Sequence, residues 1–358
     1  MIEEFHKIEP YALEHEDKQG MLTSELIRLT QWHRLKCDKY SNILSGLSYD
    51  ESRVKGIEDI PFLPVRLFKE VDMKSISDKD VFKTMTSSGT TGSRKSRIFL
   101  DKENAVLQQK VMLRLLGDFI GKKRLPTLVI DSEAVIKDRK LFTARGATIM
   151  GLDFATRKKV LALNEDMTLN ENAVHNFLKE YGNERFLIFG FTFMVWQHLY
   201  GEIRRKNLQI DLSNGYLLTG GGWKKLENDA VSREQFKRVG NELCGLSRFV
   251  DHYGMSEQSG SIYLECECGH YHTSIYSDVI IRNPDNFEQC SIGEEGIIQV
   301  VSVLPHSYPG HSLLTEDRGI VLGEDDCPCG RKGKYFTVLG RMKNAELRGC
   351  SDTYAAQF

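Results

Sequence analysis

The sequence lacks any long hydrophobic run, and no stretch of roughly 18 or more apolar residues occurs among its 358 positions. A helix that spans a bilayer needs about 20 mostly apolar residues, so the sequence predicts no transmembrane segment. The N-terminus also lacks the basic and apolar regions that make up a secretory signal. We therefore expect a cytoplasmic protein that does not span a membrane.

An excess of charge of one sign is also absent. Lys and Arg number 48 and Asp and Glu number 50, which gives a formal net charge of −2. Near-neutrality excludes a strongly basic wrapper of nucleic acid and a polybasic membrane binder. We expect no nucleic-acid partner. The length predicts roughly two domains with a large hydrophobic core.

Cysteine is too sparse for a secreted disulfide scaffold, with eight residues in the chain. Seven of the eight fall between Cys244 and Cys350, and four of these form two Cys-x-Cys pairs, 266/268 and 327/329. Histidines stand beside the first pair. This clustering indicates metal ligation or thiol chemistry in a reducing compartment.

Short apolar strands and amphipathic helices alternate between residue 81 and about residue 255. The pattern predicts strands at 81–85, 127–130, 147–150, 185–189, 216–219 and 248–251. It predicts helices at 102–120, 172–181, 192–205 and 232–243, and one before them within 23–47. Such alternation is typical of a parallel α/β sheet, whose ligand crevice lies at the C-terminal ends of the strands. Unusual loops near residues 87, 220 and 254 each follow a predicted strand.

Strands and turns dominate after residue 260, with strands predicted at 276–282, 296–304, 311–314 and 319–322. We therefore expect an α/β fold with a β-rich subdomain. The expected parts are a helical N-terminal segment (1–80), a nucleotide-binding core (81–260), the β-rich subdomain (261–340) and a short tail (341–358).

The loop over 86–97 reads Thr-Ser-Ser-Gly-Thr-Thr-Gly-Ser-Arg-Lys-Ser-Arg. Its glycines allow backbone N–H groups to turn inward, and its hydroxyls and Lys95 add donors and positive charge, which suits phosphate oxygens. The loop is not a Walker A sequence, because the glycine that should precede Lys-Ser is Arg94. A polar surface loop is the alternative interpretation.

This loop resembles the phosphate loop of the adenylate-forming superfamily, which includes the acyl-CoA synthetases. Further motifs of that superfamily follow in order: Gly220-Gly-Gly-Trp223, His252-Tyr-Gly-Met-Ser-Glu257, Thr315-Glu-Asp317 and Leu339-Gly-Arg341. Glu316 stands where the superfamily has glycine. The resemblance implies ATP and Mg²⁺ as cofactors and the following roles. Phosphate would be contacted by Ser87, Ser88, Gly89, Thr90, Thr91, Gly92 and Lys95. The nucleotide would be contacted by Gly221, Gly222, Tyr253, Gly254 and Ser256. Glu257 would hold Mg²⁺, and Asp317 and Arg341 would contact ribose or phosphate.

Only 17 residues follow Arg341, where the superfamily has a small C-terminal domain with a catalytic lysine. This short ending resembles the acyl-protein synthetases of bacterial luminescence, the LuxE family. The segments 60–69, 254–261 and 345–350 extend the resemblance over nearly the whole chain. It implies that a fatty acid is activated as its adenylate, transferred to Cys350 and passed to an acyl reductase. A neighbouring cation, Arg348, would favour the thiolate of Cys350.

The Cys/His residues offer zinc two half-sites, Cys327 with Cys329 and two ligands from 266–272. Resemblance to phenylacetate-CoA-ligase-like proteins selects Cys266, His272, Cys327 and Cys329, with Cys268 as the substitute. Unliganded thiols and a nucleic-acid zinc knuckle are the alternatives.

Two local features stay open at this stage. The aromatic-rich segment 189–196 fits an acyl pocket or simple core packing, and His252 fits a catalytic or a structural role. For the whole chain, the alternatives to self-acylation are a ligase that passes the acyl group to coenzyme A or a carrier protein, and a zinc-bearing interaction protein on a decayed adenylation fold.

Overall fold

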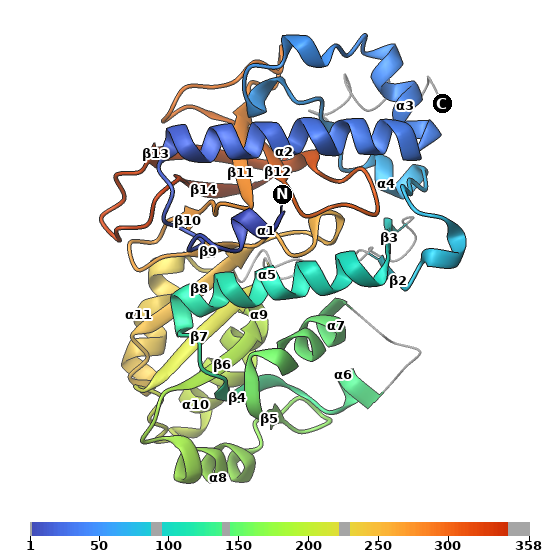
Figure 1. Ribbon diagram of the computed structural model, residues 1–358. Helices are drawn as coiled ribbons and strands as arrows, with labels where there is room; N and C mark the ends of the chain where they lie inside the picture. Colours follow the sequence, from blue (N-terminus) through green and yellow to red (C-terminus); the bar gives the residue numbers. More distant parts are fainter. Residues whose placement is uncertain (1, 87–94, 138–143, 222–229, 343–358) are drawn as a thin grey trace. The chain divides into compact units, whose positions relative to one another are not determined.

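The computed structural model describes residues 2–86, 95–137, 144–221 and 230–342 (Figure 1). The chain divides into two compact units. The first comprises residues 1–115, 254–263 and 268–358, and the second comprises 116–253 with 264–267. Within the described ranges, no helix is both long and apolar enough to cross a lipid bilayer.

The second unit is an α/β layer built on parallel strands in the order β8-β7-β6-β4-β5. The strands are β4 (Leu125–Ser132), β5 (Thr156–Leu163), β6 (Phe186–Phe191), β7 (Gly215–Gly220) and β8 (Arg248–Tyr253). The helical segments are α6 (Ala134–Lys137), α7 (Ala144–Gly151), η5 (Leu152–Phe154), α8 (Glu171–Tyr181), α9 (Thr192–Met194), η6 (Val195–Tyr200), α10 (Gly201–Lys206) and α11 (Arg233–Cys244).

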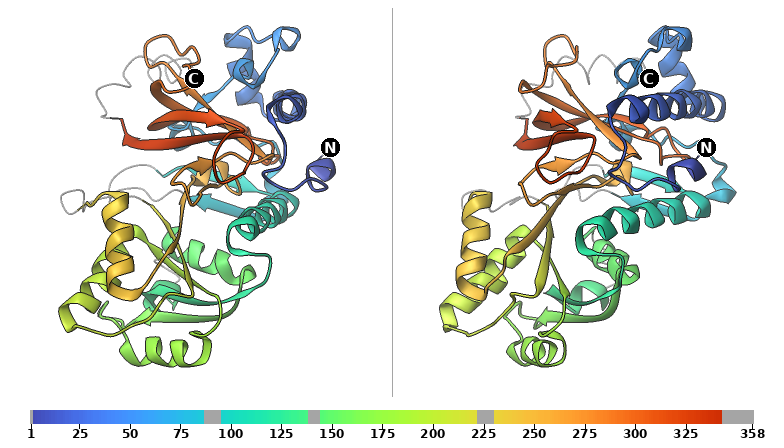
Figure 2. Two further views of the ribbon diagram at one scale, coloured as in Figure 1. Left: turned by 90° about the vertical axis from the view of Figure 1, so that its left-hand side faces the viewer. Right: turned by 60° about the vertical axis from the view of Figure 1, so that its left-hand side comes forward.

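The direction of the crossovers decides which face each helix covers. The connection from β4 to β5 runs toward one edge of the sheet, whereas the later connections run toward the other edge. Because parallel crossovers are right-handed, helices of the two groups cover opposite faces. Figures 1 and 2 show α7 and α11 on opposite sides of these strands. The core between strands and helices includes Leu128, Phe186, Ile188, Leu217 and Phe236, each at most 1% exposed.

The first unit contains a mainly antiparallel sheet with the strand order β11-β12-β13-β14-β10, and β1 pairs with β13 in parallel. Its strands are β1 (Leu63–Pro64), β10 (Tyr271–His272), β11 (Ser277–Arg282), β12 (Glu295–Ser302), β13 (Ser312–Glu324) and β14 (Lys334–Arg341). β2 (Lys83–Thr86) and β3 (Arg97–Leu100) form a separate antiparallel pair. β9 (Tyr263–Glu265) and α5 (Lys102–Ile120) each cross the boundary between the units in sequence.

Helices at the N-terminal end of the chain complete the first unit. In Figure 1, α2 runs along the strands of this unit's sheet. α2 buries Leu22, Leu26 and Leu29 completely, at the i, i+4, i+7 spacing of one helix face. The helical segments are α1 (Ile2–Phe5), α2 (His15–Lys36), α3 (Asp38–Gly46), η1 (Glu51–Arg53), η2 (Ile57–Asp59), α4 (Leu67–Glu70), η3 (Asp78–Asp80) and η8 (Ser256–Gln258).

The sequence-based fold class is confirmed, since a parallel α/β part and a β-rich part are both present. One predicted strand is wrong: residues 147–150 lie inside α7. The strand that follows is β5, which the sequence analysis missed, because Arg157, Lys158 and Lys159 interrupt its apolar pattern. The two predicted strands at 311–314 and 319–322 are one long strand, β13.

Candidate functional site

The C-terminal ends of β7 and β8 lie side by side in the second unit. The parallel register places Thr219 opposite Asp251 and Gly220 opposite His252. His252 Nδ1 donates to the Thr219 carbonyl oxygen at 2.7 Å. A carbonyl only accepts, so the bond places the imidazole proton on Nδ1. This bond supports a structural role for His252, one of the two roles left open above.

Gly220 is required by this arrangement. A Cβ atom at position 220 would lie 1.9 Å from His252 Cε1, so the histidine ring occupies the space of a side chain. Gly221 follows with φ of +75°, a conformation that favours glycine. The glycine turn begins here; Gly222 and Trp223 lie outside the described residues.

A polar network, which the sequence analysis missed, holds the same strand ends. Thr219 Oγ1 donates to Asp251 Oδ1 at 2.9 Å and accepts from Arg233 Nη1 at 3.3 Å. Arg233 Nε donates to Glu265 Oε2 at 3.1 Å, and Lys237 Nζ donates to Glu265 Oε1 at 2.8 Å. Glu265 is 3% exposed, so its charge is compensated by two cations. Thr219 is thus held through both its side chain and its carbonyl oxygen.

Glu257 lies in η8 of the first unit and is 6% exposed. The described residues provide no hydrogen-bond or ion-pair partner for its carboxylate. Its negative charge adds to burial in raising the pKa of Tyr308. A buried carboxylate without compensation is costly, which makes a cation a fitting partner for Glu257. Of its neighbours in the motif, Ser256 accepts from Ser259 Oγ through its carbonyl oxygen at 2.8 Å.

Asp317 and Arg341 face each other across β13 and β14. Their carboxylate and guanidinium are 3.7 Å apart, and the Arg341 side chain is 78% exposed. The pair therefore contributes little stability, and both groups are accessible to a polar ligand. Thr315 Oγ1 accepts from the Asp317 N–H at 3.1 Å and donates to the Ile298 carbonyl at 2.7 Å, and this segment, with Glu316 in place of glycine, is part of β13.

Among the residues predicted to contact phosphate, Lys95 is described, and its side chain is exposed. Ser87, Ser88, Gly89, Thr90, Thr91 and Gly92 lie outside the described residues, as does Cys350.

The predicted zinc ligands come together. The ligand atoms of Cys266, His272, Cys327 and Cys329 all lie within 4.8 Å of one another, and three of the four residues are buried. His272 Nε2 and Cys329 Sγ are 3.3 Å apart. Zinc bonds of about 2.3 Å to sulfur and 2.0–2.1 Å to nitrogen would place two such tetrahedral ligands about 3.5 Å apart. The cluster therefore fits a zinc ion.

Local structure explains why both cysteines of one Cys-x-Cys pair, but only one of the other, belong to the group. The Gly330 N–H donates to the Cys327 carbonyl at 2.9 Å, and Gly330 has φ of +84°, so a tight turn brings Cys327 and Cys329 to the same group. Cys268, the substitute ligand, is exposed and is not in the group. His270 Nδ1 lies 3.4 Å from Cys327 Sγ at its edge.

The aromatic-rich segment contributes to the core of the second unit. Phe189 and Val195 are buried, and the Trp196 ring stacks on Phe236 with centroids 6.2 Å apart. Core packing therefore accounts for Phe189, Val195 and Trp196.

Comparison with known proteins agrees with these motifs. The family model for the acyl-protein synthetases, LuxE, matches residues 3–358. The long-chain-fatty-acid–luciferin-component ligase of Vibrio harveyi is 24% identical over 95% of this chain and 89% of its own length. The ligase of the same name from Aliivibrio fischeri is 22% identical over 94% of this chain and 88% of its own length.

Solved structures agree on the fold. A 2-hydroxyisobutyryl-CoA ligase in an open conformation superposes with a TM-score of 0.71 and 14% identity, over 93% of this chain and 77% of that chain. The same ligase in a postadenylation state gives 0.71 and 15% identity, over 92% and 69% of the two chains. The architecture is therefore that of the adenylate-forming ligases. Because the family model covers almost every residue, the chain belongs to the LuxE acyl-protein synthetase family.

Proposed function

We propose that this protein is an ATP-dependent acyl-protein synthetase that activates a fatty acid as its adenylate and transfers the acyl group to its own Cys350. An acyl reductase then receives the acyl group. The observation that carries the proposal is the family match along residues 3–358, since this range includes both the nucleotide motifs and the Cys350 segment. The named relatives, which are fatty-acid ligases, support a long-chain acid as the substrate.

The chemistry proceeds in two displacements. A carboxylate oxygen of the acid attacks the α-phosphorus of ATP, and pyrophosphate leaves with the bond electrons. The thiolate of Cys350 then attacks the acyl carbonyl, and AMP leaves as the thioester forms. Binding and orientation of these groups are the protein's main contribution to the first step.

The described residues support specific roles. Gly221, which follows β7, and Tyr253, which ends β8, would bind the adenine. Asp317 and Arg341 would contact the ribose. Glu257 would hold Mg²⁺, which supplies neutralisation of phosphate charge. The low exposure of Glu257, together with the lack of a described protein partner for its carboxylate, supports that assignment. Lys95 and the loop before it would contact phosphate.

Zinc would be a structural cofactor held by Cys266, His272, Cys327 and Cys329. A closed set of four sulfur and nitrogen ligands is typical of structural sites, because a catalytic zinc keeps an open position. The support is the approach of the four ligand atoms to within 4.8 Å.

Intact-protein mass spectrometry after incubation with Mg-ATP and a panel of fatty acids tests the function. We expect one acid to increase the mass by its acyl group, and the increase to be absent in Cys350→Ser. Cys290→Ser is the matched control, since Cys290 is partly exposed and lies outside both proposed sites.

The half-reactions separate the alternatives. Pyrophosphate exchange that persists in Cys350→Ser would show that adenylation is independent of the acceptor. AMP formation without any protein adduct would instead favour coenzyme A or a carrier protein as the acceptor. Absence of both ATP binding and exchange would overturn the enzyme assignment.

A further inference from the structure

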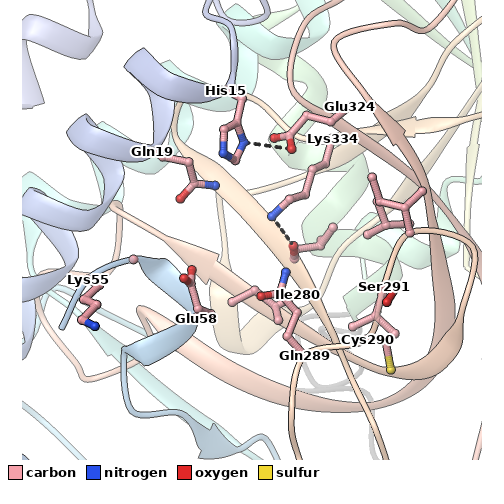
Figure 3. Close-up of a pocket in the computed structure, with 15 residues that line it drawn as sticks. His15, Gln19, Lys55, Glu58, Ile280, Gln289, Cys290, Ser291, Glu324 and Lys334 are labelled. Atoms are coloured by element: carbon pink, nitrogen blue, oxygen red, sulfur yellow. Dashed lines mark hydrogen bonds and ion pairs between the residues drawn. The ribbon is translucent and has the colours of Figure 1, made fainter. Parts of the chain in front are cut away.

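A cavity of about 420 Å³ lies in the first unit, and none of its lining residues belongs to the nucleotide motifs or the metal cluster (Figure 3). Its walls come from the start of α2, residues 55–58, β11, the loop 289–292, β13 and β14. Cavities of this size accommodate small organic ligands. Its polar groups therefore indicate which ligand it would accept.

Lys334 is the central polar group. It is 7% exposed, and Figure 3 shows its ammonium pointing into the cavity. Nζ donates to the Val279 carbonyl at 3.3 Å and lies 3.5 Å from Asp278 Oδ1. An ammonium has three N–H groups, and these two contacts are long for charged pairs. Lys334 thus has capacity for another acceptor.

The counter-ion of Lys334 is shared. Asp278 is completely buried, and its other oxygen lies 3.2 Å from Lys18 Nζ. Lys18 is 1% exposed and also donates to Thr273 Oγ1 at 2.7 Å. Burial lowers the pKa of Lys18, and the nearby charge of Lys334 lowers it further, whereas Asp278 acts in the opposite direction. One buried carboxylate thus faces two ammonium groups, and Lys18 holds it more closely.

The remaining carboxylates limit the charge of a ligand. Glu324 lines the cavity; its Oε2 lies 2.9 Å from His15 Nδ1, and its Oε1 is buried without a hydrogen-bond partner among the described residues. Glu58 lines the cavity too and would repel a second negative charge. Lys55 and the amides of Gln19 and Gln289 add donors at the rim. These features favour a single negative charge near Lys334.

We propose that this cavity binds a small organic carboxylate whose carboxylate group contacts Lys334 Nζ. The bound anion would give Lys334 a counter-ion of its own, which compensates the charge that Asp278 divides between two lysines. The apolar side chain of Ile280, which shares a strand face with Asp278, and that of Val321 would contact the alkyl part of the ligand. The site is separate from the proposed adenylation residues, so its test needs no ATP.

Cys290 provides the readout, because it lines the cavity and its thiol is partly exposed. The rate at which N-ethylmaleimide modifies Cys290 is measured by peptide mass spectrometry on the full-length protein, with hexanoate as the probe. At ten times its dissociation constant, hexanoate should slow the modification about tenfold. Inorganic phosphate, a dianion for much of its population at neutral pH, should protect less.

Three variants test the charge argument. Lys334→Gln and Gln19→Glu should each weaken protection by hexanoate at least tenfold. Gln19→Glu keeps the buried lysines and so remains informative if Lys334→Gln folds poorly. Gln197→Glu, an exposed position in η6, makes the same change of charge elsewhere and should leave protection unchanged.

Several outcomes would overturn the proposal. Equal protection in Gln19→Glu and the parent protein would remove the charge argument. Stronger protection by phosphate than by hexanoate would exclude the carboxylate assignment. A Cys290 that stays unmodified without any probe would mean that small molecules do not enter the cavity.

Discussion

Thr219 is the residue that fixes the start of the glycine turn. Its hydroxyl joins Arg233 to Asp251, and its carbonyl oxygen accepts from His252. A hydrogen bond contributes about 1 kcal/mol on average, and more when a partner is charged. Thr219 therefore holds the ends of two adjacent strands in one register, and the contacts of its hydroxyl are ones that a hydrophobic residue could not make.

Replacing Gly220 with alanine should disrupt this arrangement. The new Cβ would overlap the His252 ring, which must move and give up its bond to Thr219. We expect a loss of about 1–3 kcal/mol in the free energy of unfolding. The KM for ATP in pyrophosphate exchange should also rise, because the glycine turn starts at this residue.

Gly201→Ala is the matched control for that variant. A Cβ at position 201 in α10 meets only the Trp196 carbonyl, at 3.5 Å. Alanine favours a helix over glycine by about 1 kcal/mol, so this variant should be neutral or slightly stabilised. Urea unfolding compares the two, and equal stability of both variants would contradict the argument from the His252 ring.

At this scale, motifs and spacing located some residues and not others. Residue types and spacing indicated two half-sites, the family resemblance selected Cys266 and His272 to join Cys327 and Cys329, and the structure brings these four together. The contact between Arg233 and Glu265 joins positions 32 residues apart. Neither residue belongs to a recognisable motif, so only tertiary structure reveals the pair.

At the scale of elements, α2 and the start of β13 enclose a buried polar cluster. His33 stacks on His311 with ring centroids 5.1 Å apart, and both side chains are at most 1% exposed. His311 Nε2 hydrogen-bonds with Thr30 Oγ1 at 2.9 Å. The other partner of His311 is Tyr40, at 3.3 Å. The helix thus meets the sheet through neutral imidazoles.

This cluster should make stability depend on pH. Burial lowers the pKa of His311 to about 3 and holds that of His33 well below its ordinary value. The unfolded chain, with a histidine pKa of about 6.5, binds more protons below that pH, so acid favours unfolding. Between pH 7 and pH 5, His311 alone should cost about 2 kcal/mol.

The slope of unfolding free energy against pH checks this expectation. His311→Gln should flatten the slope between pH 7 and pH 5 even if the variant is less stable at every pH. His175→Gln, on the exposed face of α8, should not change the slope. If both variants kept the parent slope, the histidine cluster would not be its cause.

Elements were predicted best where an apolar period was long. The helix at 102–120 matches α5, whose residues Lys102–Ile120 keep one period over five turns. Residues 147–150 form a short apolar run, and such runs do not distinguish a strand from a helix. β5 was missed because a strand at the edge of the sheet carries charged side chains, among them Arg157 and Lys159.

At the scale of the molecule, each of the two units contains its own run of paired strands and its own buried side chains. The proposed zinc would join segments of the first unit that are far apart in sequence, because His272 ends β10 whereas Cys327 and Cys329 precede β14. β10 has only two residues, Tyr271 and His272, paired with Phe336 and Tyr335. A metal crosslink would therefore add much of the stability of so short a strand pairing.

Chelation of zinc should therefore loosen β10 and β14. We expect hydrogen exchange measured by mass spectrometry to increase in both strands after treatment with a chelator, while α8 and β6 stay protected. Cys329→Ser should release the metal, and Cys290→Ser should retain it. Protein that purifies without metal, and whose exchange the chelator does not alter, would contradict the zinc assignment.

The fold class was predictable because alternation of strands and helices is a repeated signal over a long stretch of chain. The roles of Asp317 and Arg341 came from motifs, and the register of β13 with β14 now shows them opposite each other. The cavity at Lys334 had no sequence signal. Its residues come from six separate segments, and none of those segments has a distinctive composition.

The contact of Gly220 with His252 also has an evolutionary consequence. A ring that fills the place of a missing side chain makes the two positions dependent on each other. A lineage that acquired alanine at 220 would first need a smaller residue at 252, and that residue would give up the bond to Thr219. We therefore expect glycine and histidine at these positions to be inherited together among descendants that keep the turn, and to be lost together where it is abandoned.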